Sequence, residues 1–498
     1  MGERRGWRTG RAVVVALALA AGGLAVAPPP ATAAPAPVPA PVLTAPPAGL
    51  RGYPLWDSYG DLAPFGYEEQ EYFVSGAALD RAGTVHGYTT RILVSRPIDP
   101  KRFNGTVLLD WVNVTAQFEN AVDTLEARPM LMREGYAFVH TSLQSAGLCC
   151  IPLTAKGWDP LRYGAISHPG DAWSFDMLAQ IAQSFRHPKK GSLDPMGQLG
   201  ARSVRHVLAA GQSQSAIRLR EYVDSWLPAH RNAVGLIEGF LIHGDVGVAK
   251  RFFHRLPVKV LNLLSDYEAL DDHVDPAKLD PSYRLWEVAG AGHSDYFIGH
   301  QSVAGHGPRV MLGLPKETSE HYGATLLAAG NYGEVLHPEL LACTVAGSAM
   351  PMHYVVSSAL HQLNRWVGGG RAPDNGPRFE FVDGKQAYDA HGNPKGGIRL
   401  PPIEVPVATY LSTLCQLGGI TIPDTDLQLQ QRYGTHAEYF RQMAAATDVA
   451  VSRGWILPED SLDLMARACM AKGRFPDSRN RCRRYVPPAY DQPLPTRR

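Results

Sequence analysis

The residues best suited to chemistry form a short motif at 211–215, Gly-Gln-Ser-Gln-Ser, with Ser213 at its centre. The motif follows an apolar run at 206–210 and precedes a segment with helical spacing, so a strand is expected to turn directly into a helix here. Such a turn needs small residues two places before and after the serine. Gly211 meets this need, and Ser215 stands where glycine is usual. The pattern predicts a serine nucleophile beside the partial positive charge of a helix N-terminus.

A serine hydroxyl becomes a strong nucleophile only when a base removes its proton, and an acid must orient that base. Residues 257–264 read as a buried strand that ends in Ser-Asp-Tyr-Glu at 265–268. In this kind of fold the acid follows the nucleophile and lies just beyond a strand. Glu268 has the usual spacing from the small residue at the strand end and is the favoured acid, with Asp266 as the alternative.

The predicted base is His293, which lies on a glycine-rich loop at 289–295 directly after a strand at 283–288. It follows the serine and the acid in the order expected of the fold. His300 and His306 are nearby competitors. A metal cluster of His293, Asp295, His300 and His306 is the less favoured alternative use of the same segment.

Two backbone N–H groups should stabilise the developing oxyanion. One belongs to the residue after the nucleophile, Gln214, and the other to a loop after an earlier strand. That strand is expected at 106–112, and among Asn113, Val114 and Thr115 we favour Val114 as the second donor. This chemistry requires no cofactor and no metal.

The motif, the acid and the histidine together predict a hydrolase that cleaves a small-molecule carboxylic ester through an acyl-enzyme. An amide or a lactone is the alternative substrate class on the same residues. A non-catalytic secreted binding protein on a hydrolase scaffold is the alternative of a different kind, and the presence of all three residue types in order disfavours it.

The elements that must position these residues alternate between apolar strands and amphipathic helices, which predicts an α/β fold with a mainly parallel sheet covered by helices. The expected strands lie at 106–112, 136–140, 204–209, 236–242, 258–264 and 284–288. Helical spacing is found at 175–185, 214–226, 427–443 and 461–470, and His353 begins a further buried helix.

The N-terminus has the features of a secretory signal peptide at 1–33: early arginines, an apolar run at 12–27 and small residues at 31–33. We expect a disordered Pro/Ala-rich leader at 34–47, a catalytic core at 48–370 and a C-terminal extension at 371–498 packed on that core. The net charge of +1 argues against nucleic acid as a partner. After signal removal, no segment is long and apolar enough to span a membrane.

Six cysteines are present, and an even number in an exported protein favours disulfides. Proximity suggests Cys469 with Cys482 and Cys343 with Cys415. The remaining two, at 149 and 150, are neighbours, and their mutual pairing is strained compared with pairing elsewhere.

Several segments resemble a bacterial α/β-hydrolase-domain family of secreted serine esterases. They are 211–216 (Gly-Gln-Ser-Gln-Ser-Ala), 159–164 (Asp-Pro-Leu-Arg-Tyr-Gly), 167–171 (Ser-His-Pro-Gly-Asp), 285–290 (Leu-Trp-Glu-Val-Ala-Gly), 397–401 (Gly-Ile-Arg-Leu-Pro) and 404–409 (Glu-Val-Pro-Val-Ala-Thr). The resemblance implies the α/β-hydrolase fold and a triad carried by Ser213 and His293, with the extension as part of one catalytic unit. Family members read Ser-Glu-Thr-Asp where this chain has Ser-Asp-Tyr-Glu at 265–268, which leaves both acids open.

Overall fold

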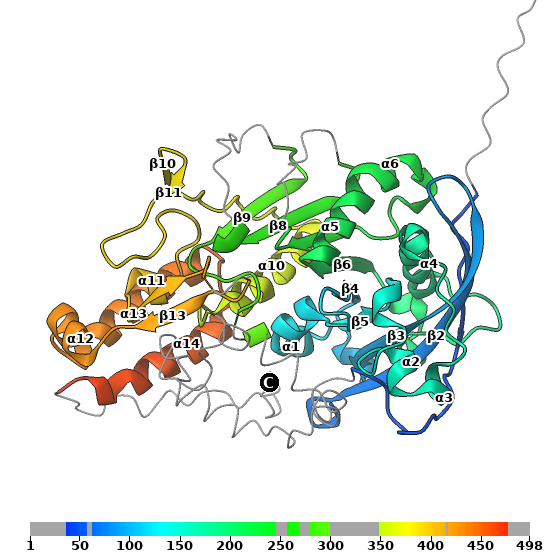
Figure 1. Cartoon of the computed structure of the whole chain (residues 1–498), viewed down its shortest axis with the longest axis horizontal. Coiled ribbons are helices and arrows are strands. Elements are labelled where there is room, and N and C mark those ends of the chain that lie inside the picture. Colours follow the sequence, from blue (N-terminus) through cyan, green and yellow to red (C-terminus); the bar gives the residue numbers. More distant parts are fainter. Residues whose placement is uncertain are drawn as a thin grey trace, which may run out of the picture. The chain divides into compact units, whose positions relative to one another are not determined.

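The computed structural model describes residues 36–56, 62–245, 256–268, 279–295, 297–298, 348–414 and 417–476 (Figure 1). The chain divides into Met1–Ala36 and Pro37–Arg498, and the description that follows concerns the second unit. The predicted signal peptide, His300, His306, Cys343, Cys415 and Cys482 lie outside the described residues.

The centre of the second unit is a nine-stranded sheet in the order β1-β2-β3-β5-β4-β6-β7-β8-β9. Its strands are β1 (Val42–Thr44), β2 (Tyr67–Leu79), β3 (Val85–Pro97), β4 (Thr106–Trp111), β5 (Ala137–Thr141), β6 (His206–Gln212), β7 (Gly239–His243), β8 (Lys259–Ser265) and β9 (Tyr283–Val288). The strands from β5 to β9 in this order are parallel, and β1, β2 and β3 join them by antiparallel pairing. This architecture confirms the α/β fold with a mainly parallel sheet.

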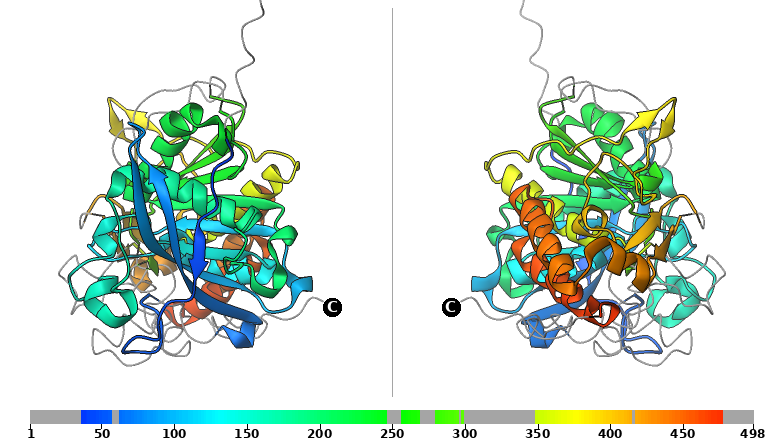
Figure 2. Two further views of the ribbon diagram at one scale, coloured as in Figure 1. Left: turned by 90° about the vertical axis from the view of Figure 1, so that its right-hand side faces the viewer. Right: turned by 90° about the vertical axis from the view of Figure 1, so that its left-hand side faces the viewer.

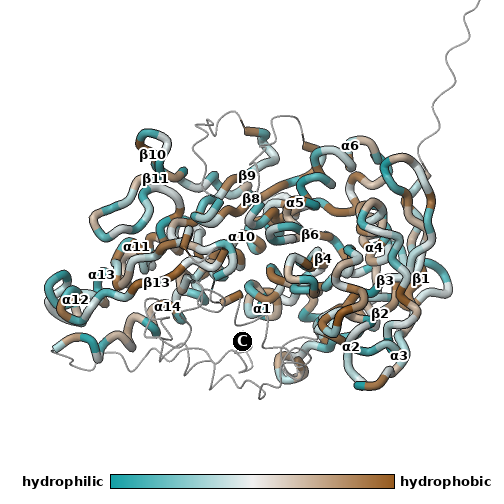
Figure 3. Tube along the Cα trace, in the orientation of Figure 1, coloured by the Kyte–Doolittle hydropathy of each residue, from teal (hydrophilic) through white to brown (hydrophobic). Residues whose placement is uncertain are grey.

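Helices cover both faces of the sheet because alternate strand residues point to opposite sides. One face packs Leu108 and Leu208 against α1 (Val122–Glu134) and α10 (Met352–Val367). The other face packs Val107 and Val207 against α4 (Ser174–Arg186) and α5 (Gln214–Glu221). Figure 3 shows hydrophobic residues along central strands such as β8. The short helices α2 (Ala155–Trp158), α3 (Pro160–Tyr163) and α6 (Leu227–Ala229) complete this part.

The N-terminal segment corrects one expectation. We expected a disordered leader up to residue 47, but β1 pairs with Phe73, Val74 and Ser75 of β2. Val38 and Leu43 are buried in the same core cluster as β2. Two buried apolar side chains and a paired strand supply the contacts that a Pro/Ala-rich composition alone does not reveal.

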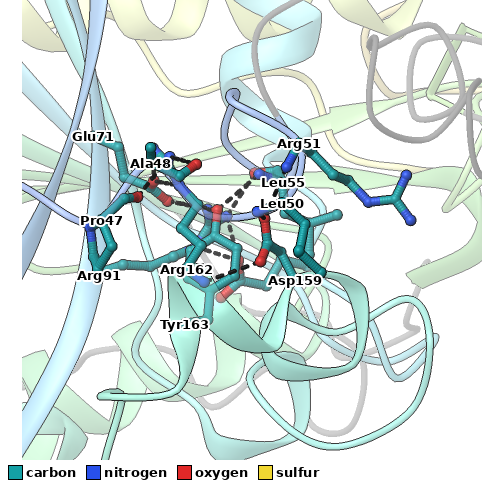
Figure 4. A network of polar contacts seen from close by, with 11 residues as sticks. Pro47, Ala48, Leu50, Arg51, Leu55, Glu71, Arg91, Asp159, Arg162 and Tyr163 are labelled. Atoms are coloured by element: carbon teal, nitrogen blue, oxygen red, sulfur yellow. Dashed lines mark hydrogen bonds and ion pairs between the residues drawn. The ribbon is translucent and has the colours of Figure 1, made fainter.

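A buried polar network holds the segment that follows β1 (Figure 4). The Arg91 guanidinium of β3 donates to Glu71 at 2.6 Å and to Glu119 at 2.8 Å, with its side chain only 2% exposed. Arg162 donates to the backbone carbonyls of Pro47 and Ala48, at 3.0 and 3.1 Å. The network therefore ties this segment to the sheet and to α3.

Replacing Arg91 with methionine is expected to lower the free energy of unfolding by about 3–5 kcal/mol. The buried Glu119 carboxylate would lose the cation that pairs with it, and the Glu71 carboxylate would keep only Arg162. Urea unfolding of the variant and the parent measures this difference. The matched control is Arg371→Met, which breaks an ion pair whose side chains are both 83% exposed and should leave the urea midpoint unchanged. Equal midpoints for Arg91→Met and the parent would contradict the assigned role of the network.

The C-terminal extension is joined to the edge of the sheet. Ile398 extends the sheet beyond β9 through a parallel bridge to Val288. The Ile398 N–H donates a hydrogen bond to the backbone carbonyl of Glu287 at 2.6 Å. The extension contains the hairpins β10 (Phe381–Val382) with β11 (Lys385–Gln386) and β12 (Ala408–Leu411) with β13 (Ile420–Pro423). Its helices are α11 (Pro401–Glu404), α12 (Asp426–Tyr433), α13 (His436–Ser452) and α14 (Pro458–Met470), of which α13 and α14 lie side by side (Figure 2).

The disulfides differ in part from the favoured pairing. The structure joins the adjacent residues Cys149 and Cys150 in a disulfide. From the sequence we expected this pairing to be strained and pairing with other cysteines to be more favourable. Cys469 is disulfide-bonded to a partner outside the described residues, so its pairing with Cys482 stays a prediction. Among the described helices, none has the length and apolar character needed to cross a membrane.

Candidate active site

Ser213 lies at the turn between β6 and α5, in an unusual backbone conformation. Its φ of 61° and ψ of −121° fall in a region that side chains rarely adopt, so the surrounding contacts must hold it there. A Cβ added at Gly211 would lie 3.1 Å from the Cβ of Ser215, which is the crowding that demands a small residue at 211. The serine at 215 is accommodated with no exposed surface. The turn thus matches the geometry expected of a nucleophile elbow.

The structure brings Ser213, His293 and Glu268 into one hydrogen-bonded chain. The Nε2 of His293 lies 2.7 Å from the Oγ of Ser213, and its Nδ1 forms a short hydrogen bond with the Oε1 of Glu268. All three side chains are buried. With the proton on Nδ1 donated to the carboxylate, Nε2 is free to accept the proton of the serine.

Two further hydrogen bonds fix the Glu268 carboxylate. Both the backbone N–H and the hydroxyl of Ser265 donate to Oε2 of Glu268 at 2.6 Å. Burial raises the pKa of Glu268, but the hydrogen bond and charge of His293 and the bonds from Ser265 outweigh it and hold the pKa below its ordinary value. The carboxylate therefore stays ionised and can stabilise a cationic His293.

Asp266, the alternative acid, lies in a different set of contacts. Its two carboxylate oxygens accept hydrogen bonds from Gln386 and from Ser412, both in the C-terminal extension. Burial is the largest of the effects that raise the pKa of Asp266 to about 6. The structure thus brings Glu268, and not Asp266, to the histidine.

Two backbone N–H groups at the predicted oxyanion positions have no hydrogen-bond partner among the described residues. One is that of Gln214, the first residue of α5. The other is that of Val114, because its neighbours are used: the Asn113 N–H donates to Asn120 and the Thr115 N–H to the Asn113 side chain, each at 2.8 Å. Of the three residues that the sequence left open, Val114 is the one whose N–H remains available.

Side chains tie the Val114 loop to the serine turn. The Asn113 amide donates to the carbonyl of Gln212 at 3.0 Å, and the Ser215 hydroxyl donates to the carbonyl of Val112 at 3.2 Å. The Ser215 that replaces the usual glycine therefore takes part in positioning the loop. These bonds hold the Val114 loop against the turn that carries Ser213 and Gln214.

Sequence reasoning did not single out several residues that position His293. The Gln212 amide donates to the backbone carbonyl of His293 at 2.8 Å. The Tyr267 ring packs 5.6 Å from the His293 ring, measured between centroids. Gln212 directly precedes the predicted nucleophile, and Tyr267 directly precedes the predicted acid. This proximity in the sequence could have identified both residues. Gly244, which follows β7, faces the imidazole and carries no such signal.

Replacing Gly244 with alanine is expected to lower kcat/KM about tenfold or more, because the new Cβ would lie 3.2 Å from Cε1 and Nδ1 of His293. Gly244 also has a φ of +64°, which strains any side chain. Gly83→Ala is the matched control, with a φ of +83° and open space around the added Cβ. It should lose stability and keep activity. An equal loss of activity in both variants would contradict the steric explanation.

The C-terminal extension also supports the histidine loop. The Ser294 N–H donates to the Leu417 carbonyl at 2.9 Å, and Gly292 lies so close to the Gly418 carbonyl that a Cβ would collide with it. Together with the contacts of Asp266, these interactions show that residues beyond 370 help to form the site.

The described residues of the alternative metal cluster, His293 and Asp295, have other hydrogen-bond partners. His293 is engaged by Ser213 and Glu268, and the Asp295 carboxylate accepts the Ile298 N–H at 2.8 Å. His353 lies in α10, as predicted, and stacks on Phe297. Among the described residues, Asp295 and His293 do not belong to a group of side chains that could hold a metal ion.

The fold and the site together define a hydrolase of the α/β class. The chain belongs to the family described as the α/β-hydrolase domain, whose model matches residues 34–466, including most of the extension. This match confirms that the sequence motifs identify an α/β-hydrolase-domain family. No curated protein matches the chain.

Solved structures similar to this chain include bacterial and archaeal esterases. A brefeldin A esterase, a bacterial homologue of human hormone-sensitive lipase, is 15% identical over 36% of this chain and 39% of its own, with a TM-score of 0.21. An esterase of Pyrococcus furiosus is 8% identical over 55% of this chain and 94% of its own, with a TM-score of 0.25. The assignment to the family rests on the family match and not on these likenesses.

Proposed function

We propose that the protein is an exported serine hydrolase that cleaves carboxylic esters of small molecules through an acyl-enzyme on Ser213. The observation that carries the proposal is the hydrogen-bonded chain from Ser213 through His293 to Glu268, with the serine on a strained turn at the start of a helix. The ester class follows from the resemblance to an esterase family. A non-catalytic binding protein would have no need to retain all three groups in contact.

In the proposed reaction, Ser213 Oγ attacks the ester carbonyl carbon while His293 Nε2 takes the hydroxyl proton. The negative charge that develops on the carbonyl oxygen is stabilised by the N–H groups of Gln214 and Val114. The carbon–oxygen bond to the alcohol then breaks, and His293 donates its proton to the leaving oxygen. Water repeats the sequence on the acyl-enzyme, which releases the acid and restores Ser213.

Glu268 holds the His293 ring in one orientation and stabilises its cationic form during both halves of the reaction. The reaction uses only side chains and backbone groups of this chain. The same arrangement can attack an amide or a lactone, and the substrate panel below separates these classes.

The test uses protein recovered from the culture medium of an expression host, whose mass shows whether residues 1–33 have been removed. It is assayed against p-nitrophenyl esters of short and long acyl chains, a p-nitroanilide and a lactone. We expect turnover of the esters, with a preference among chain lengths. Turnover of only the anilide or the lactone would keep the serine mechanism and overturn the ester class. A folded protein that turns over none of them would favour the binding-protein alternative.

A further inference from the structure

A second group of chemically active side chains lies beside the proposed triad. Asp123 and Glu126 of α1 and His243 at the end of β7 place their candidate ligand atoms within 4.8 Å of one another. The Nδ1 of His243 lies 3.0 Å from Oδ1 of Asp123 and 3.6 Å from Oε2 of Glu126. All three side chains are fully or almost fully buried.

The charge of this cluster is not balanced by the described residues around it. Glu126 lies close to three further buried carboxylates, those of Asp123, Asp110 and Asp295. Within the described part of the chain, no lysine or arginine forms an ion pair with any of these four carboxylates. A group of buried carboxylates with one imidazole must bind protons or a cation, since isolated buried charges are very unfavourable.

Unsatisfied oxygen atoms point to the cation. Among the described residues, neither carboxylate oxygen of Glu126 has a hydrogen-bond partner, although the side chain is buried. One oxygen of Asp123 and one of Asp295 are also without a partner. Buried polar atoms without partners are rare and call for an unseen ligand or proton.

We propose that Asp123, Glu126 and His243 bind one divalent transition-metal ion, with Zn²⁺ as the ion that best suits an imidazole nitrogen and two carboxylate oxygens. Ligand atoms about 2.0–2.2 Å from a tetrahedral zinc are separated by roughly 3.3–3.6 Å. The measured separations of 3.0 and 3.6 Å from His243 Nδ1 are close to this range. Ca²⁺ and Mg²⁺ are disfavoured, because both prefer oxygen ligands only.

The position of the site gives the ion a structural role. The backbone carbonyl of His243 accepts the N–H of Ser213 at 2.8 Å, and Gly244 faces the ring of His293. An ion held by α1 and the end of β7 would therefore fix the backbone beneath the proposed nucleophile. It takes no part in the proposed proton transfers and is inferred independently of them.

The test measures metal content and thermal stability, not activity. The full mature chain is stripped with EDTA, incubated with Zn²⁺, Mn²⁺, Ca²⁺ or Mg²⁺ and passed through a desalting column. We expect about one equivalent of retained Zn²⁺, by elemental mass spectrometry, and a rise in Tm over the stripped protein. We expect no retained Ca²⁺ or Mg²⁺. A parent protein that retains no transition metal and whose Tm does not move would overturn the proposal, because the carboxylates would then hold protons instead.

The variants locate the ion. Glu126→Gln should retain less than about a tenth of the parent's zinc and lose the rise in Tm. The matched control is Glu134→Gln, on the same helix. The Glu134 carboxylate lies 2.8 Å from Nδ1 of His361, and among the described residues this pair belongs to no group of three possible metal ligands. It should bind zinc as the parent does. Full retention by Glu126→Gln would overturn the site. If Glu126→Gln does not fold, the visible spectrum of the parent protein with bound Co²⁺ tests the ligand set instead. Nitrogen and oxygen ligands should give d–d bands without thiolate charge transfer. A protein that binds no Co²⁺, or one that shows a thiolate charge-transfer band, would overturn the site.

Discussion

Replacing Ser213 with alanine is expected to lower kcat/KM toward the preferred ester by on the order of 10⁵–10⁶-fold, with no loss of folding. The Ser213 hydroxyl lies 2.7 Å from His293 Nε2, where its proton can be removed as the acyl bond forms. Replacing His293 with alanine should lower kcat/KM about as much as replacing Ser213 does. Replacing both residues should lower kcat/KM no further than either single replacement, because the two side chains act as one unit. Initial-rate kinetics of the two single variants and the double variant measure these effects.

The control for this prediction is Ser215→Ala, in the same turn. The Ser215 hydroxyl donates to the Val112 carbonyl at 3.2 Å, and among the described residues it forms no hydrogen bond with His293. Its loss should lower kcat/KM by less than about tenfold, the effect of one neutral hydrogen bond. Activity that persists in Ser213→Ala, or a Ser215→Ala variant as inactive as Ser213→Ala, would show that the nucleophile is misassigned.

Changing Glu268 to glutamine is expected to lower kcat/KM by about 10³–10⁴-fold while the protein remains folded. A neutral amide in place of the carboxylate no longer stabilises the cationic histidine, and it can favour the wrong ring tautomer. The hydrogen bonds from Ser265 can still be made to the amide oxygen. The effect should therefore fall on kcat, and rates measured at saturating ester report it directly.

The companion variant Asp266→Asn distinguishes the two acids. Asp266 bonds to Gln386 and Ser412, away from the histidine, so its loss of charge should change kcat by no more than a few fold. The pKa of the Glu268 carboxyl is held below its ordinary value. The ionised carboxylate therefore supports His293 fully at any pH above that ordinary pKa. The support is lost only as the pH falls through the lowered pKa. A large loss in Asp266→Asn with an active Glu268→Gln would reverse the assignment.

The central elements could be predicted because their signal is local. Each predicted strand of the parallel core coincides with an observed one to within three residues at either end, since a strand buried on both faces reads as a continuous apolar run. The helix after Ser213 begins where expected, although it passes into a π-helical turn at Tyr222–Trp226. The backbone φ of Ser213 follows from the same short motif.

The rest depends on contacts between residues distant in the chain. The antiparallel strands β2 and β3 were not predicted, although Asp80 and Gly83 mark the turn between them. Asp266 and Glu268 could not be fully separated from the sequence. His293, which binds Glu268, and Gln386 and Ser412, which bind Asp266, reach these acids only in the folded chain. Long-range pairing of this kind has no local pattern to read.

The central claim is that Ser213 is the nucleophile, and mapping a covalent adduct tests it most directly. The mature protein is treated with a fluorophosphonate, weighed intact, digested and sequenced by mass spectrometry. The account predicts one adduct per chain, on Ser213, which disappears in Ser213→Ala and weakens strongly in His293→Ala. An adduct on a different residue, or none on a folded protein that hydrolyses esters, would contradict it.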